Sequence, residues 1–189
     1  TDGYSTSTTS YLSITNGGNV SVPKLNRTIV VDGTTYARTC AGINSAIDSL
    51  PSTGGEVYLP EGTYTCATPI NIDVNDTTLR GAGWNTIITS AGSNLTYVID
   101  LNGKDEVTLK DFKIVGNSGG SGSPGDGIGT SVAQVQDALI DHVWVASADG
   151  VGIQINRGDR VKIVNSKVSS SDSYGIHFSN GFGDNNVIS

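Results

Sequence analysis

Short segments with alternating apolar and polar residues recur along the chain at nearly constant spacing. Three of them, at 107–114, 138–145 and 161–168, align with one another and have the period of two that is typical of β-strands. The step from 107 to 138 is longer than the step from 138 to 161 because a Gly/Ser segment, 117–125, is inserted. We therefore expect these three segments to be equivalent strands in successive copies of one structural unit.

A second series of similar segments has the same period. Turns that begin at Asp126, Asp149 and Asp172 follow one another in equal steps, each as long as the step from 138 to 161, and a short alternating segment comes after each turn. A fixed step in the twenties, with several strands per copy, indicates a solenoid in which each copy forms one coil. A β-sandwich has turns at similar density but no fixed step. The predicted fold class is all-β: a right-handed, single-stranded parallel β-helix.

One segment has the spacing of a helix instead. We expect a helix at about 39–50, with Thr39 as its N-cap and Pro51 ending it. Its apolar stripe consists of Cys40, Ile43, Ile47 and Leu50. An open β-helix exposes apolar core and unpaired strand edges at its end, and an amphipathic helix covers both. The sequence thus predicts an N-terminal capping helix.

The start of the chain differs in composition from the rest. Residues 1–27 are rich in Ser, Thr, Gly and Asn and are predicted to be a flexible leader or attachment segment. Asp32-Gly33, between strand-forming residues at 28–31 and 34–36, predicts a tight hairpin. The β-helix domain is expected to cover 28–189 and to continue beyond Ser189, because the chain ends midway through a coil.

Composition and charge exclude some classes of binding partner. The net charge of −7 argues against nucleic acid as a partner, and no run of apolar residues is long enough for a membrane span. A neutral or cationic partner remains, or an acidic glycan whose charge is met locally by a few Lys and Arg side chains. Cys40 and Cys66 are either one disulfide or two buried thiols, because pairing does not follow from sequence alone.

Three stretches resemble a known family. Residues 43–51, 54–64 and 79–83 are similar to the pectate-lyase superfamily in its tailspike and rhamnogalacturonase-like branch, and the resemblance covers about 37–189. The chain departs from the pattern before the helix, where relatives often carry an Asp-rich Gly-Asp-Gly-type turn. The resemblance implies an extracellular, cell-surface or virion protein that cleaves, epimerises or binds glycans, and by analogy with tailspikes a homotrimer or a larger assembly.

The aspartates of the second series are the first candidate site. If Asp126, Asp149 and Asp172 stack, neighbouring carboxylates lie about 5 Å apart and alternate ones about 10 Å apart. Acid–base hydrolysis of a glycoside uses carboxylate pairs in this range, and like charges so close also recruit a cation such as Ca²⁺. The alternative is structural, since Asp-Gly forms turns and repeats reuse their turns.

Other candidate residues lie near this series. His177 is a candidate general base one period beyond Gln154, and Arg157 or Lys162 can neutralise a uronate carboxylate. The rings of Trp144 and Tyr174 offer surfaces on which sugars stack. The structural alternative for His177 is a place in a polar ladder, and for Arg157 and Lys162 it is a solvated edge. The sequence has no zinc-binding Cys/His spacing, no phosphate-binding loop and no nucleophilic Ser motif.

Two functions are therefore predicted. In the first, the chain recognises polysaccharide, and cleaves it as a hydrolase or lyase, along a groove on one sheet. In the second, it is a non-catalytic adhesion module, such as the shaft of a tailspike, a tail fibre or a surface filament. Fold alone does not choose between them.

Overall fold

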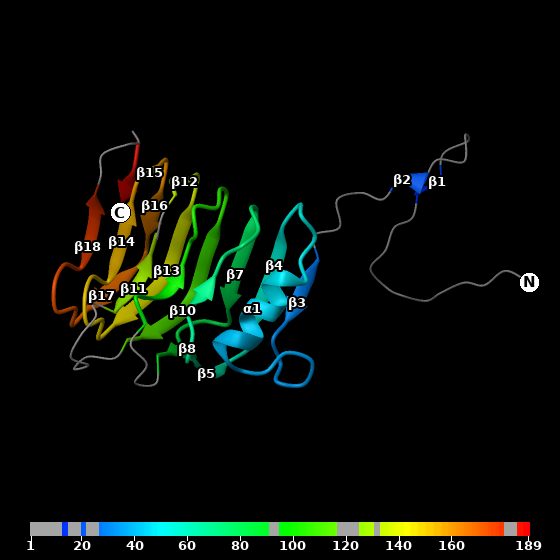
Figure 1. Cartoon of the computed structure of the whole chain (residues 1–189), viewed down its shortest axis with the longest axis horizontal. Helices are drawn as coiled ribbons and strands as arrows, with labels where there is room; N and C mark the ends of the chain where they lie inside the picture. The colour runs from blue at the N-terminus through cyan, green and yellow to red at the C-terminus, as the bar shows by residue number, and fades with distance from the viewer. Residues whose placement is uncertain are drawn as a thin grey trace, which may run out of the picture.

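The computed structural model describes residues 13–14, 20–21, 27–90, 95–116, 125–130, 133–179 and 185–189. Parallel strands lie side by side along the long axis of the body, with one helix at its N-terminal end (Figure 1). The all-β parallel β-helix with a capping helix is thus confirmed. The predicted division into a leader, 1–27, and a domain stays a prediction, because most of the leader lies outside the described residues.

The strands form two main sheets. The first sheet runs in the order β19 (Val187–Ile188), β16 (Lys162–Val164), β13 (Leu139–Ala146), β10 (Thr108–Val115), β7 (Thr77–Gly81), β4 (Gly55–Leu59) and β3 (Thr28–Val30), and also includes β5 (Gly62–Thr65), β8 (Thr86–Thr89) and β17 (Lys167–Ser169). The second sheet runs in the order β18 (Ile176–Ser179), β14 (Ile153–Asn156), β11 (Asp126–Gly129), β9 (Tyr97–Asp100) and β6 (Ile70–Asn71). Two small pairs complete the set, β12 (Val135–Gln136) with β15 (Gly158–Asp159) and the antiparallel β1 (Ser13–Ile14) with β2 (Val20–Ser21).

The core is a stack of equivalent aliphatic side chains. In the first sheet the register joins Val57, Leu79, Leu109, Ile140 and Ile163, one from each of five successive coils. Each of them is at most 1% exposed. Burial of one such side chain contributes about 1.5 to 3 kcal/mol, so a column of five contributes substantially to the free energy of folding. The pairing of Leu109 with Ile140 and of Ile140 with Ile163 confirms both predicted steps of the repeat.

Six successive coils, those from β4 to β19, turn into the first sheet through the same backbone conformation. The residue two positions before the first outward residue of the strand has positive φ in six successive coils. These residues are Gly54 (80°), Asp76 (54°), Glu106 (59°), Asp137 (54°), Arg160 (54°) and Asn185 (70°). A left-handed residue costs about 1 to 2 kcal/mol unless it is Gly, and Asn and Asp tolerate it best. We call this set the left-handed column; it stays in register although the coils differ in length.

The helix α1 (Cys40–Asp48) caps the N-terminal end of the coils. Thr39 is its N-cap, as predicted, and its hydroxyl accepts a hydrogen bond from the Gly42 N–H at 3.1 Å. The helix ends at Asp48 with Ser49 as its C-cap, two residues before the approximate end that was predicted. The Leu50 N–H bonds to the Ile47 carbonyl, which tightens the last turn before Pro51.

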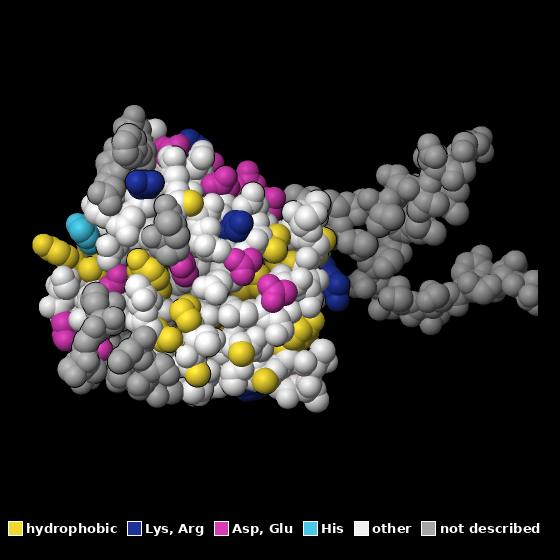
Figure 2. Space-filling view, viewed as in Figure 1, with side chains coloured by type: hydrophobic (Ala, Val, Ile, Leu, Met, Phe, Trp, Pro, Cys, Tyr) yellow, Lys and Arg dark blue, Asp and Glu magenta, His cyan; other side chains and the backbone are white. Residues whose placement is uncertain are grey.

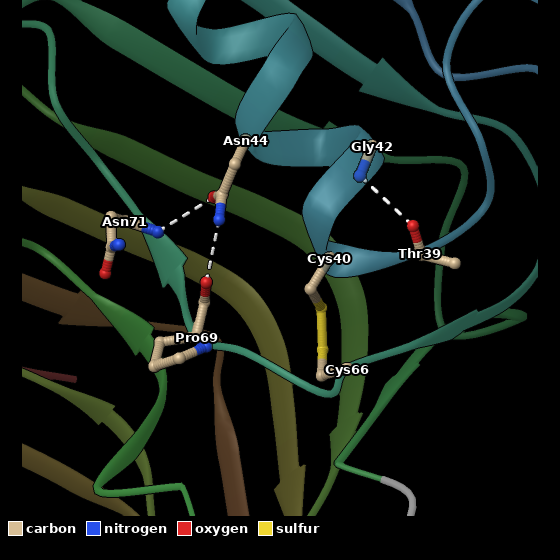
Figure 3. The surroundings of a disulfide bond; sticks show 7 residues. All are labelled: Thr39, Cys40, Gly42, Asn44, Cys66, Pro69 and Asn71. Carbon is tan, nitrogen blue, oxygen red and sulfur yellow. Dashed lines mark hydrogen bonds between the residues drawn. A yellow bond between two sulfur atoms is a disulfide. The ribbon is translucent and has the colours of Figure 1, made fainter.

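A disulfide and one asparagine attach the helix to the first coil. Cys40 and Cys66 are bridged, so the alternative of two free thiols is excluded (Figure 3). The Asn44 amide donates to the Pro69 carbonyl at 2.9 Å and accepts from the Asn71 N–H at 3.0 Å. Asn44 therefore supplies the hydrogen bonds that a further strand would give to the free edge of β6.

The predicted hairpin at Asp32-Gly33 is wrong. β3 pairs in parallel with β4, and residues 33–36 form bends rather than a returning strand. The Asp32 carboxylate accepts a hydrogen bond from the Thr34 N–H at 2.8 Å, and the Gly33 N–H bonds to the Tyr36 carbonyl. These local hydrogen bonds close a compact loop that leads into the helix. The loop forms in place of the hairpin because its hydrogen bonds satisfy the same backbone groups.

Candidate functional site

Asp126 is buried, and its carboxylate forms a hydrogen bond with the backbone of the next coil. It is 4% exposed at the start of β11, where its carboxylate accepts a hydrogen bond from the Val151 N–H at 2.7 Å. Burial raises the pKa of this carboxyl. A carboxyl in this position holds one coil to the next, and little of it reaches a ligand on the surface.

The prediction that Asp126, Asp149 and Asp172 stack in successive coils is wrong for the first pair. Ile128 pairs with Ile153, so the neighbour of Asp126 in the next coil is Val151 rather than Asp149. Asp149 lies beside Gly125 instead, as the hydrogen bond from the Gly150 N–H to the Gly125 carbonyl shows. The physical reason is that the coil between these strands is longer than the repeat by two positions. The second step, from Asp149 to Asp172, has the predicted length, because Ile153 pairs with Ile176.

The other candidates of the second sheet form an exposed ring pair. His177 pairs with Gln154 in the register, as expected from the period. The rings of Tyr174 and His177 stack with centroids 4.8 Å apart, and Tyr174 is 59% exposed. Arg157 follows β14 of this sheet with a φ of 66°. The catalytic and binding roles of these residues, and of Asp149 and Asp172, stay predictions.

Lys162 and Trp144 lie in the first sheet instead. Lys162 lines a hollow of about 470 Å³ together with Leu139 and Arg160. The guanidinium of Arg160 is held by Asp137 through two contacts of 2.7 Å, which leaves Lys162 as the more available cation of this hollow. The predicted site residues are therefore divided between two sheets rather than gathered in one groove.

The surroundings of Trp144 form a cluster that we call the indole corner. Its members are Trp84, Asp111, Lys113, His142, Trp144 and Lys167. The corner exists because β10 and β13 each bend at a left-handed residue, Asp111 (φ 61°) and His142 (φ 53°). Such a residue interrupts the alternation, so that two consecutive side chains face outward at each bend.

Trp84 reaches the corner from a loop. In the register Lys110 pairs with Arg80 and Lys113 pairs with Ile87, so the coil of β7 and β8 has four more residues at this bend. The Trp84 indole N–H donates to the His142 carbonyl at 3.1 Å, and the two rings stack with centroids 4.8 Å apart. Trp84 is still 37% exposed. The loop thus places a partly exposed indole over a residue that lies two coils later in the chain.

Charged groups surround the two indoles. The His142 Nδ1 lies 3.0 Å from the Asp111 carboxylate, and the Lys110 ammonium lies 3.7 Å from the same carboxylate. The ammonium groups of Lys113 and Lys167 lie 3.8 and 4.5 Å from the centroid of the Trp144 ring. Aromatic faces with cations and a paired imidazole are suited to a sugar, which stacks on rings and accepts hydrogen bonds from cations.

A second, acidic hollow of about 450 Å³ lies at the N-terminal coils of the same sheet. It is lined by Thr28, Thr53, Gly55, Glu56, Asp76, Thr78 and Glu106. Arg80 contacts both carboxylate oxygens of Glu56 at 2.9 Å and lowers its pKa, so this carboxylate stays ionised over a wide pH range. On the face shown in Figure 2, acidic side chains gather toward one edge, whereas Lys and Arg side chains are scattered over the face.

The described ranges hold neither a metal cluster nor a membrane helix. Within them, no group of three or more His, Cys, Asp or Glu side chains is arranged to hold a metal ion, and Ca²⁺ beside stacked carboxylates stays a prediction. Within the same ranges, no helix has the length and hydropathy that a membrane crossing requires.

Sequence reasoning missed most of the indole corner. Trp144 was a candidate, but Trp84, Asp111 and Lys113 were not. Trp84 comes from a Gly-Ala-Gly loop two coils away from His142, and a contact across two coils leaves no periodic signal. The one available signal was the tryptophan itself, since an indole in a Gly-rich loop has no core position to fill.

Comparisons with known proteins find a relative by sequence and a neighbour by structure. No known family profile matches the chain. The chain is 30% identical to an exo-β-1,3-glucanase of Streptomyces sp. (strain SirexAA-E / ActE) over 152 residues, in a match that takes in 64% of this chain and 24% of the glucanase. The chain thus spans about a quarter of the length of that relative.

A virus protein is similar in structure. The fold is similar to that of the ORF18 protein of Geobacillus virus E2, with a TM-score of 0.50 and 16% sequence identity. The match covers 93% of this chain and 47% of the virus protein. At that identity the likeness shows a shared fold and nothing of function.

Proposed function

We propose that this chain is the β-helix part of an extracellular or virion protein that recognises polysaccharide on the outer face of the first sheet. The indole corner carries this proposal, because it combines a partly exposed indole, a carboxylate-paired imidazole and two ammonium groups on one surface. Trp84 provides the stacking surface, and the cations provide donors to sugar hydroxyls.

Two further observations support a glycan partner. The relative is named as an exo-β-1,3-glucanase, a polysaccharide-cleaving enzyme. The chain also resembles the tailspike and rhamnogalacturonase-like branch of the pectate-lyase superfamily, in stretches that include the capping helix and β4. Both are consistent with a location outside the cell or on a virion.

Hydrolysis is proposed as the accompanying activity, at the acidic hollow. Glycoside hydrolysis uses two carboxyl groups, about 5 to 5.5 Å apart in retaining and about 6.5 to 9.5 Å apart in inverting enzymes. Glu56, held ionised by Arg80, is suited to act as the base or nucleophile. Asp76 lines the same hollow one coil further along and is the candidate acid.

Binding to a panel of soluble polysaccharides tests recognition. Trp84→Ala is expected to weaken binding about tenfold, since loss of one stacking contact costs about 1 to 1.5 kcal/mol. Tyr174→Ala is the matched control, because it removes an exposed ring from the second sheet. If Tyr174→Ala abolishes binding and Trp84→Ala does not, the glycan face is the second sheet, and the proposal for the first sheet is wrong.

Release of reducing ends from the bound polysaccharide tests hydrolysis. Glu56→Gln is expected to abolish turnover while binding persists, and Asp149→Ala is expected to leave turnover unchanged. Turnover that depends on Asp149 would return the chemistry to the aspartates of the second series. Binding without turnover of any glycan would leave an adhesion module, and the hydrolytic part of the proposal would be lost.

A further inference from the structure

We propose that the indole corner selects a glycan that carries an anionic group, a carboxylate, sulfate or phosphate, which binds to the ammonium groups of Lys113 and Lys167 beside the Trp144 ring. This inference rests on the proposed glycan recognition and adds the class of ligand. It also separates this chain from its relative, since a β-1,3-glucan without substituents is neutral.

The register places three side chains in one outward row. Lys113, Trp144 and Lys167 pair with one another in successive coils, so the indole lies between the two lysines. Neighbouring coils are about 4.8 Å apart, which separates the two lysine backbones by about 10 Å. Both side chains lean onto the ring, with Nζ at 3.8 and 4.5 Å from its centroid. Two ammonium groups are thereby brought together at one indole.

The two ammonium groups have no carboxylate partner in the described part of the chain. The ion pairs found there involve Lys110, Arg80, Arg160 and His142, but neither Lys113 nor Lys167. An ammonium has three N–H donors, and contact with a ring face leaves donors available for an anion. The ring contact also restricts the side chain, which reduces the entropy lost when an anion binds.

Two carboxylates on the same strands as the row, those of Asp111 and Asp141, have other partners. Asp111 is in contact with both His142 and Lys110, and Asp141 accepts a hydrogen bond from the Asn165 amide at 2.9 Å. Neither carboxylate forms an ion pair with Lys113 or Lys167, although the chain as a whole carries a net charge of −7. An acidic protein repels anions at long range, so a local pair of unpaired cations is the feature that gives an anionic ligand a place to bind.

The row lies next to the stacking surface. The Trp84 and Trp144 rings meet edge to face with centroids 5.5 Å apart. A sugar in contact with the exposed part of Trp84 thus lies next to the indole ring that both ammonium groups contact. The Trp144 indole N–H donates to the Ser169 hydroxyl at 2.9 Å, which fixes the ring between the lysines.

The test compares charged and neutral polymers on the same protein. The probes are polygalacturonate for carboxylate, chondroitin sulfate for sulfate, a glycerol-phosphate teichoic acid for phosphate, and laminarin as the neutral β-1,3-glucan. We expect at least one charged polymer to bind more tightly than laminarin, with affinity that falls as salt is added. Lys113→Gln/Lys167→Gln is expected to weaken that binding about tenfold, and to weaken any laminarin binding much less, because a neutral sugar loses only hydrogen-bond donors.

The control and the contrary outcomes separate this inference from the proposed function. Lys104→Gln removes one positive charge from a turn outside the corner and is expected to have no effect. Binding of laminarin that is lost in Trp84→Ala, with no preference for any charged polymer, would support glycan recognition and overturn the anionic ligand. Failure of all four polymers to bind would overturn both.

Discussion

Removal of the Cys40–Cys66 bridge is expected to destabilise the N-terminal end of the β-helix. The perturbation is Cys40→Ala/Cys66→Ala, which cuts the covalent link between the first residue of α1 and the residue that follows β5. Both cysteines are fully buried, and alanine is small and apolar enough to occupy these positions without a clash. The effect therefore comes mainly from the loss of the link.

The magnitude follows from the length of the closed loop. The bridge joins residues 26 positions apart. In the chain-entropy description, closure of a loop of that length lowers the free energy of the native relative to the unfolded state by about 3.5 kcal/mol at 25 °C. The two hydrogen bonds of Asn44 remain in the variant and contribute about 1 kcal/mol each, so α1 is expected to stay in place under native conditions.

Urea unfolding followed by circular dichroism measures the loss, and hydrogen exchange locates it. Because each coil of a solenoid contacts only its neighbours, amide protection is expected to fall in α1 and β6 and to persist in β14. Asn44→Ala in the bridged protein is the control for the hydrogen bonds alone. A loss below about 1 kcal/mol, or a uniform loss of protection along the chain, would refute the loop-closure reasoning.

Three further substitutions test other parts of the structure. Asp126→Asn is expected to raise the free energy of unfolding at neutral pH, because burial raises the pKa of the Asp126 carboxyl in the folded state and its ionisation then opposes folding. This gain in stability vanishes below the ordinary Asp pKa, and a gain that does not depend on pH would contradict the argument. Glu56→Gln is expected to lower the free energy of unfolding by about 1 kcal/mol near neutral pH. Because Arg80 lowers the pKa of Glu56, the ion pair stabilises the fold fully above the pKa of Glu56 in the unfolded state, and this stabilisation is lost as the pH falls through the folded-state pKa. Denaturation at several pH values checks this dependence. Gly54→Ala is expected to cost about 2 kcal/mol or more, because its φ is +80° and a Cβ there lies 2.3 Å from a carbonyl oxygen of the next coil. Gly83→Ala, with a φ of +115° and open space around the Cβ, is the matched control with strain alone, and equal melting temperatures for the two would count against the steric argument.

The parts of the fold that follow from period and alternation were predictable. Leu109, Ile140 and Ile163 stack as the repeat indicates, because each side chain is selected directly by its place in the core. The cap at Thr39 was also predictable, since its side-chain oxygen accepts a hydrogen bond within the next three residues. Local and strictly periodic interactions leave their mark on the sequence.

Interactions that depend on the length of a coil were not predictable. Asp126 and Asp149 begin similar turns, yet two extra residues in the intervening coil move them out of register. The chain compensates in surface turns, where an added residue costs little and changes no core position. The same reason hid the contact between Trp84 and His142, because the loop that carries Trp84 has no counterpart in the other coils.

The left-handed column from Gly54 to Asn185 has a consequence for redesign. The same backbone conformation precedes the first-sheet strand in six successive described coils, whereas the length of chain between these positions varies from coil to coil. The stacked core strands and the loops that connect them can therefore be changed independently. Segments of new sequence can replace the loop at 82–85, and so exchange the surface offered to a ligand, while the stacked interior keeps its alignment.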